Sequence, residues 1–110
     1  MTIASTVEIE LPSPAPGTQR RLRVHRYGAP GSRPKAYFQA ALHADEIPGL
    51  LVAQHLLHQL EQARTENRII GEIVVVPVAN PIGLSQHLNG RLLGRFDFES
   101  TGNFNRGFPD

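Results

Sequence analysis

The sequence contains no cysteine, and that absence excludes several kinds of site together. Disulfides, thiolate nucleophiles and cysteine-ligated zinc centres all require a thiol. The five histidines are then the only soft-nitrogen metal ligands that the chain offers. A transition-metal site in this chain would therefore depend on histidine.

Long apolar runs and excess charge are also missing. No apolar run approaches the ~20 residues of a membrane helix, and residues 1–11 lack the basic start and apolar segment of a signal peptide. The 110 residues are 40% apolar and 19% charged, with a formal net charge of +1. This composition is typical of one folded domain and favours neither a nucleic-acid nor a membrane partner. We expect a cytoplasmic protein.

Hydrophobic periodicity predicts four strands and one helix. Alternation predicts half-buried strands over residues 6–11 and 19–27, joined by a proline-rich turn and paired antiparallel near a sheet edge. The nearly continuous apolar run 35–42 predicts a central strand covered on both faces. An amphipathic helix begins near Pro48, and the β-branched run within 69–78 predicts a buried strand.

The order strand, helix, strand over residues 35–78 is that of a parallel βαβ unit with a right-handed crossover. Such a unit brings Asn80 and Pro81, which follow the second strand, beside the loop that follows the first. Residues 82–110 show no clear periodicity. We expect a long functional loop region there, with one short helix just before residues 84–88.

The loop 43–46 between the first of these strands and the helix carries the strongest candidate site. His43 and Glu46 lie three residues apart at the carboxyl end of a strand, where open α/β sheets present ligand-binding groups. Imidazole nitrogen and carboxylate oxygen both suit Zn²⁺. The alternative is a loop histidine beside a solvated acid that the helix dipole stabilises.

Two other patterns are weaker. His55 and His58 have a metal-compatible helical spacing, but a solvated helix face explains them equally well. Clustered arginines in the second strand could suggest nucleic acid, but they lack the aromatic platform that binds single strands, and exposed charge also protects a sheet edge. These arginines are Arg20, Arg21, Arg23 and Arg26.

Near the end of the sequence, Asn105 and Arg106 form a candidate anion site. A guanidinium binds a carboxylate through two parallel hydrogen bonds, and a neighbouring amide can donate another. Because Asn, Gly and Pro also favour turns, residues 102–109 could equally be a turn.

In this order and spacing, His43-x-x-Glu46, Asn80-Pro81 and Asn105-Arg106-x-Phe108-Pro109 resemble the succinylglutamate desuccinylase/aspartoacylase family, a branch of the zinc carboxypeptidase-like hydrolases. The resemblance implies an α/β fold with a mixed sheet between helices. It implies that His43 and Glu46 are the first two zinc ligands, and that Asn105 and Arg106 hold the substrate carboxylate. The reaction implied is zinc-assisted hydrolysis of a small N-acyl amino acid. Asp45 favours the deacylase branch.

Two departures from the family pattern limit these expectations. Phe98 stands where the family carries an arginine that steadies the acyl oxygen, and Arg91 and Arg95 are the alternatives. The family's third zinc ligand and general base follow the Asn-Arg pair, whereas His87 precedes it. We therefore expect residues 1–110 to be the N-terminal part of a single, truncated zinc-hydrolase domain, inactive alone. A non-catalytic carboxylate- or protein-binding module and a zinc carboxypeptidase are the alternatives.

Overall fold

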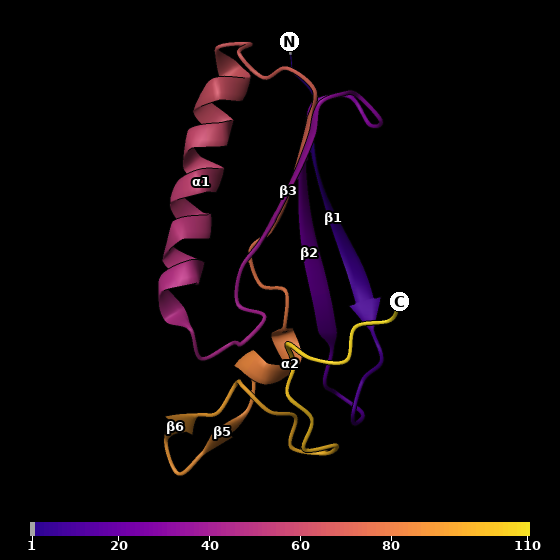
Figure 1. Ribbon diagram of the computed structural model, residues 1–110, viewed down its shortest axis with the longest axis vertical. Coiled ribbons are helices and arrows are strands. Elements are labelled where there is room, and N and C mark those ends of the chain that lie inside the picture. Colours follow the sequence, from indigo (N-terminus) through magenta and orange to yellow (C-terminus); the bar gives the residue numbers. More distant parts are fainter. Residues whose placement is uncertain (1) are drawn as a thin grey trace.

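A computed structural model describes residues 2–110 and contains a mixed four-stranded sheet with one long helix on one face (Figure 1). The strands stand in the order β1 (Ala4–Leu11), β2 (Arg20–Tyr27), β4 (Glu72–Val76) and β3 (Lys35–Gln39). Only β3 and β4 are parallel; the other neighbouring pairs are antiparallel. The predicted α/β fold class with a mixed sheet is confirmed; of the helices expected on both sides of the sheet, the described residues supply one long helix on one face.

The β1–β2 hairpin forms at the sheet edge as predicted, with Val7 opposite Val24 in the antiparallel register. The predicted half-burial of the first strand is wrong, because Val7 is 44% exposed and Ile9 is 46% exposed. Val24 is buried by neighbours in the sheet, whereas β1 has a strand on one side only. Alternation in the sequence therefore identified the strand but not its edge position.

The parallel βαβ unit is confirmed: β3 and β4 pair in parallel and α1 (Ile47–Thr65) connects them. The central strand is β4, whose valines contribute to clusters on both sides of the sheet. Val74 and Val76 pack with Val24 on one face, and Val75 packs with residues of β2 and α1 on the other. Side chains of three β-branched residues in succession suit a strand buried in this way.

The prediction of a central strand over residues 35–42 is wrong. Strand β3 ends at Gln39 and lies at the edge of the four-stranded sheet, with Tyr37 56% exposed and Phe38 47% exposed. Residue Ala41, with φ of 57°, is already outside the extended conformation. An apolar run in the sequence indicates that a strand packs against other apolar groups. It does not indicate whether the strand lies at the centre or at the edge of the sheet.

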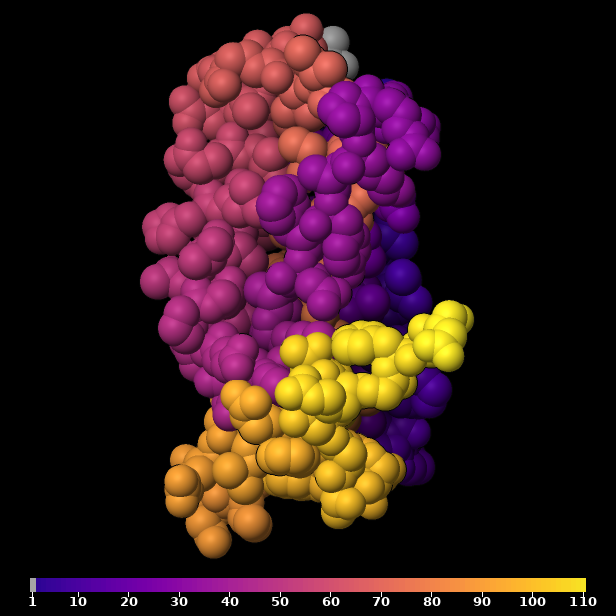
Figure 2. All heavy atoms as spheres, in the orientation of Figure 1, coloured from indigo at the N-terminus to yellow at the C-terminus, as the bar shows by residue number. Residues whose placement is uncertain are grey.

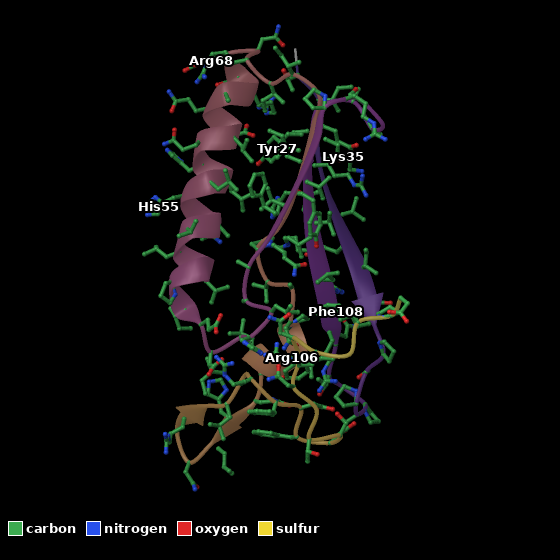
Figure 3. The ribbon with its side chains drawn as sticks, in the orientation of Figure 1. Tyr27, Lys35, His55, Arg68, Arg106 and Phe108 are labelled. Carbon is green, nitrogen blue, oxygen red and sulfur yellow. The ribbon has the colours of Figure 1, made fainter. Side chains whose placement is uncertain are left out.

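The helix α1 covers the sheet through Ala53 and Leu60, which are buried. Leu60 packs with Tyr27 and Val75, and the labelled Tyr27 ring lies between the strands and the helix in Figure 3. His55 points away from the sheet in the same view. The predicted helix start is confirmed, with a proline in the first turn.

At the start of β4, the side chain of Glu72 is only 1% exposed. Its carboxylate accepts hydrogen bonds from Arg26 at 3.0 Å and from the backbone N–H of Gly31 at 3.1 Å. Lys35 lies 3.2 Å from the other carboxylate oxygen. These contacts fasten the loop before β3 to the start of β4, since a buried carboxylate requires such partners.

After β4 the chain forms the short helix α2 (Pro81–Leu84) and a hairpin of β5 (His87–Leu88) and β6 (Arg91–Leu92). The helix was expected and the hairpin was not. Residues beyond the hairpin return across the end of the sheet, as the yellow spheres in Figure 2 show. Among residues 2–110, no helix combines the length and apolar character needed to span a membrane.

Candidate functional site

The loop that follows β3 is held against the end of β4 by backbone and amide hydrogen bonds. The N–H of Ala79 donates to the carbonyl of Ala40 at 2.8 Å, and Asn80 Nδ2 donates to the carbonyl of Leu42 at 2.9 Å. Asn80 Oδ1 also accepts the backbone N–H of Gly83 at the start of α2. The predicted proximity of Asn80 to the 43–46 loop is therefore confirmed, and its amide has a structural role.

The side chains of His43 and Glu46 lie close together in this loop. His43 is 7% exposed, and its Nδ1 lies 3.4 Å from Glu46 Oε1. Glu46 stands at the N-cap of α1, but its side chain makes no capping hydrogen bond. Its carboxylate is therefore directed to the site instead of to the helix end.

Asn103 determines which nitrogen of His43 carries a proton. Asn103 Oδ1 accepts the backbone N–H of Asn105 at 2.9 Å, so this atom is the amide oxygen. The same oxygen lies 2.7 Å from His43 Nε2, which must donate to it. The lone pair of Nδ1 then faces the Glu46 carboxylate, and a metal ion between the two atoms could bind both.

The donor set fits zinc in part. Two tetrahedral ligands at zinc distances are about 3.4 Å apart, which equals the separation of His43 Nδ1 and Glu46 Oε1. Metal-ligating histidines also donate their second ring N–H to an acceptor, as His43 does to Asn103. Within the described residues no group of three His, Asp or Glu side chains could hold a metal. This stretch therefore supplies two zinc-type donors.

Arg95 brings a guanidinium to the same carboxylate. Its Nη2 lies 2.9 Å from Glu46 Oε1, although 49 residues separate the two in sequence. The loop that carries Arg95 is joined to the candidate site through Gly94, whose carbonyl accepts the N–H of Ala44 at 2.9 Å. A Cβ at Gly94 would lie 2.7 Å from the backbone nitrogen of Asp45, so only glycine permits this approach.

The residues named from the sequence differ in their placement. Asn105 lines a cavity of about 520 Å³ together with His43 and Glu46, between β3 and the first turns of α1. Arg106 does not line that cavity; it is exposed, and its Nη1 donates to the carbonyl of Asn105 at 2.6 Å. Figure 3 shows the labelled Arg106 at the level of α2.

Gln86 holds the loop beside the site, and sequence reasoning missed it. The side chain is buried, and its Nε2 donates to the carbonyls of Leu93 and Phe96 at 2.9 and 2.8 Å. Its Oε1 accepts the N–H of Phe98 at 2.9 Å. A glutamine after a short helix is usually exposed, so the sequence contained no signal for this role. Asn103 was missed because the residue that it contacts, His43, is 60 residues away in the sequence.

A second turn in this loop is closed by Asp97. Its Oδ2 accepts the N–H of Ser100 at 3.0 Å and the hydroxyl of the same residue at 2.7 Å. The Ser100 hydroxyl, followed by its N–H, lowers the pKa of Asp97. The loop that carries Arg95 is therefore shaped by local polar contacts.

Residues 32–110 match the succinylglutamate desuccinylase/aspartoacylase catalytic domain. The chain is similar to solved structures that bear the same family name. One, from Shewanella frigidimarina, is 28% identical with a TM-score of 0.74 over 100% of this chain. Another, from Shewanella amazonensis, is 30% identical with a TM-score of 0.73 over 96% of it.

A third solved structure, from Rhodobacter sphaeroides, is 17% identical with a TM-score of 0.70 over 96% of this chain, and supports the fold alone. The chain spans 29%, 28% and 30% of the lengths of these three proteins, in the order given. No curated protein matches the chain.

Proposed function

Because the chain belongs to the succinylglutamate desuccinylase/aspartoacylase family, we propose that it forms part of a zinc-dependent hydrolase. The proposed reaction removes the acyl group from a small N-acyl amino acid. The observation that carries the proposal is the pair of zinc-type donors, His43 Nδ1 and Glu46 Oε1, at 3.4 Å in a loop beside a cavity. When bound, zinc would polarise the acyl carbonyl and acidify a water molecule.

In this proposal, His43 and Glu46 hold the metal and Asn103 is a positioning residue. The hydrogen bond from His43 Nε2 to Asn103 fixes the imidazole tautomer and directs Nδ1 toward Glu46. Since Asn103 is neutral, it orients the ring without adding negative charge. The buried position of His43 also limits the orientations that its ring can adopt.

Arg95 is our candidate for stabilising negative charge on the acyl oxygen, in preference to Arg91. Its guanidinium is 2.9 Å from Glu46, whereas Arg91 belongs to the exposed hairpin. A fixed cation at the place where charge develops lowers the barrier more than it would in water. Its ion pair with Glu46 keeps it at the site while no substrate is bound.

Asn105 and Arg106 are proposed to bind the free carboxylate of the substrate. Asn105 lines the cavity beside His43, and no ion pair engages Arg106 among residues 2–110. Its guanidinium is exposed and can exchange a backbone carbonyl for a carboxylate, which forms the stronger, charge-assisted contact.

The metal assignment is tested by His43→Ala in the full-length protein. We expect zinc content, measured by elemental mass spectrometry, and N-acyl amino acid hydrolysis to be lost together, because the buried donor is removed. His55→Ala is the matched control, since His55 is an exposed histidine on α1. Stoichiometric zinc in purified His43→Ala protein would disprove the assignment.

The carboxylate assignment is tested by Arg106→Ala. Losing a charge-assisted contact costs about 1.5–3 kcal/mol, so kcat/KM for N-acyl amino acids should fall by roughly 10- to 150-fold. Amide-capped analogues should lose much less. Arg68→Ala, at the opposite end of the molecule, is the control. Equal losses on free and capped substrates would count against a carboxylate role.

A further inference from the structure

A second, nearly apolar cavity of about 340 Å³ lies beside the candidate metal pair. It is lined by Asp45, Leu93, Arg95, Phe96 and Phe98. The three apolar side chains remain 38%, 51% and 49% exposed, in that order. Clustered large apolar groups that stay exposed and carry a polar rim usually mark a binding site.

The exposure of these side chains is built into the loop. The buried amide of Gln86 forms hydrogen bonds with the backbones of Leu93, Phe96 and Phe98, the three residues that supply the apolar lining. The N–H of Leu93 also donates to the carbonyl of Gln86 at 2.8 Å. A loop held by buried hydrogen bonds cannot easily fold its side chains inward, so the cavity is preorganised.

Two charged residues of the cavity lining connect it to the candidate metal pair. Asp45 directly precedes Glu46 in the chain, and Arg95 contacts Glu46 Oε1 at 2.9 Å. A molecule held at His43 and Glu46 could therefore extend past Arg95 into the apolar cavity. The volume lies at the lower end of the range of small-molecule pockets, about 300–1,000 Å³, which is sufficient for one side chain or acyl chain.

We propose that this cavity binds a branched aliphatic or aromatic group of the substrate. The substrate class is then an N-acyl amino acid with an apolar group on its acyl or its amino-acid side. This inference rests on the proposed function for the reaction, but the apolar site itself does not require bound zinc. The charged rim leaves room for the polar amide, while the phenylalanines and leucine receive the apolar group.

The experiment compares two substrate series on the zinc-loaded, full-length protein. N-acetyl derivatives of phenylalanine, leucine, alanine and aspartate vary the amino-acid side, and N-acetyl-, N-hexanoyl- and N-benzoyl-alanine vary the acyl side. The variants are Phe98→Ala and the milder Leu93→Ala. Leu88→Ala is the control, because Leu88 is exposed on the neighbouring β5–β6 hairpin but does not line the cavity. Circular dichroism checks that each variant folds.

We expect kcat/KM to be at least about 10-fold higher for the apolar members of one series. Phe98→Ala or Leu93→Ala should reduce that preference, and Leu88→Ala should not. Whichever series shows the preference identifies the side of the substrate that enters the cavity. Hydrolysis of N-acetylaspartate with no preference for apolar groups would overturn the inference while leaving the proposed function intact.

A binding measurement separates the two proposals. In metal-free protein, N-acetylphenylalanine or N-benzoylalanine should shift the backbone amide resonances of Phe96 and Phe98, and Phe98→Ala should weaken the binding. Such shifts in metal-free protein, together with no turnover of any substrate by the zinc-loaded protein, would support the apolar site and refute the proposed reaction. Dimerisation in light scattering that Phe98→Ala abolishes would instead assign the apolar surface to a second copy and overturn the inference.

Discussion

The middle of the sheet and the region of residues 80–105 bury different kinds of side chain. The sheet buries three valines, Val74, Val75 and Val76, whereas the later region buries two amides, those of Asn80 and Gln86. The buried valines, leucine and tyrosine of the described residues all precede residue 77. The earlier half of the chain is therefore organised by apolar contact. The later half is organised by hydrogen bonds from two amides and by the close approach of Gly94.

The two kinds of organisation have different tolerances. Apolar packing is non-directional, so a neighbouring side chain of similar volume can often replace another. An amide that serves three backbone groups has no substitute, because donors and acceptors must occupy particular positions. The loop with Arg95 and the apolar cavity is thus the part where single substitutions should alter shape most selectively.

The largest effect should come from the apolar half. Val75→Ala removes two buried methyl groups and leaves a cavity, so the global free energy of unfolding should fall by about 2–3 kcal/mol in urea titrations. Val52→Ala, an exposed position on α1, should change it by less than about 0.5 kcal/mol. Similar losses in both variants would mean that β4 is not the centre of the core.

A more local effect is expected in the polar half. Gln86→Leu leaves two carbonyls and one N–H without their partner in a loop at the surface, and one such group that stays buried costs about 1–3 kcal/mol. Hydrogen exchange at the Phe98 amide should accelerate about 10-fold or more, since 1.4 kcal/mol corresponds to a factor of ten. Exchange at Val75 should be unchanged.

Gln59→Leu, on the exposed side of α1, is the control for this substitution. Loss of protection throughout the sheet in Gln86→Leu would show that the two halves unfold together. The later half would then not be organised separately from the sheet, because the amide of Gln86 would support the whole fold.

The difference between the halves also explains what the sequence could predict. Periodicity and β-branching identified the strands, helix α1 and the parallel βαβ unit, because these follow from one-dimensional patterns of apolar residues. The same patterns could not rank the strands across the sheet, so the edge strand β3 was expected at the centre. Which strand is central depends on pairings between residues far apart in the chain.

At the candidate site, the sequence suggested His43 and Glu46, and the structure brings their side chains to 3.4 Å. Their three-residue spacing made that contact local. The contact from Asn103 to His43 spans 60 residues and that from Arg95 to Glu46 spans 49. Both contacts depend on the path of an aperiodic loop. Gln86 holds that path through its hydrogen bonds, and no sequence pattern predicts this role.

The smallest effect, confined to acidic solution, concerns Glu72, whose carboxylate is buried within the apolar half. The backbone N–H of Gly31 lowers the pKa of Glu72, with Lys35 and Arg26 acting in the same direction against the cost of burial. Because the folded-state pKa is below the unfolded value of about 4.3, ionised Glu72 stabilises the fold above that value. The contribution is lost as the pH falls through the folded-state pKa.

The free energy of unfolding of Glu72→Gln should therefore differ from that of the native protein by a constant amount from pH 7 to about pH 5, and the difference should shrink in more acidic solution. Glu61→Gln is the control: hydrogen bonding to Arg64 also lowers the pKa of Glu61, but that pair is at the surface and should contribute less. Urea titrations at pH 7, 5, 4 and 3 would measure both. A difference for Glu72→Gln that is unchanged at pH 3 would show that the buried carboxylate acts through its shape and not through its charge. The contribution of Glu72 to the free energy of unfolding would then be as insensitive to pH as that of the neutral amide of Gln86.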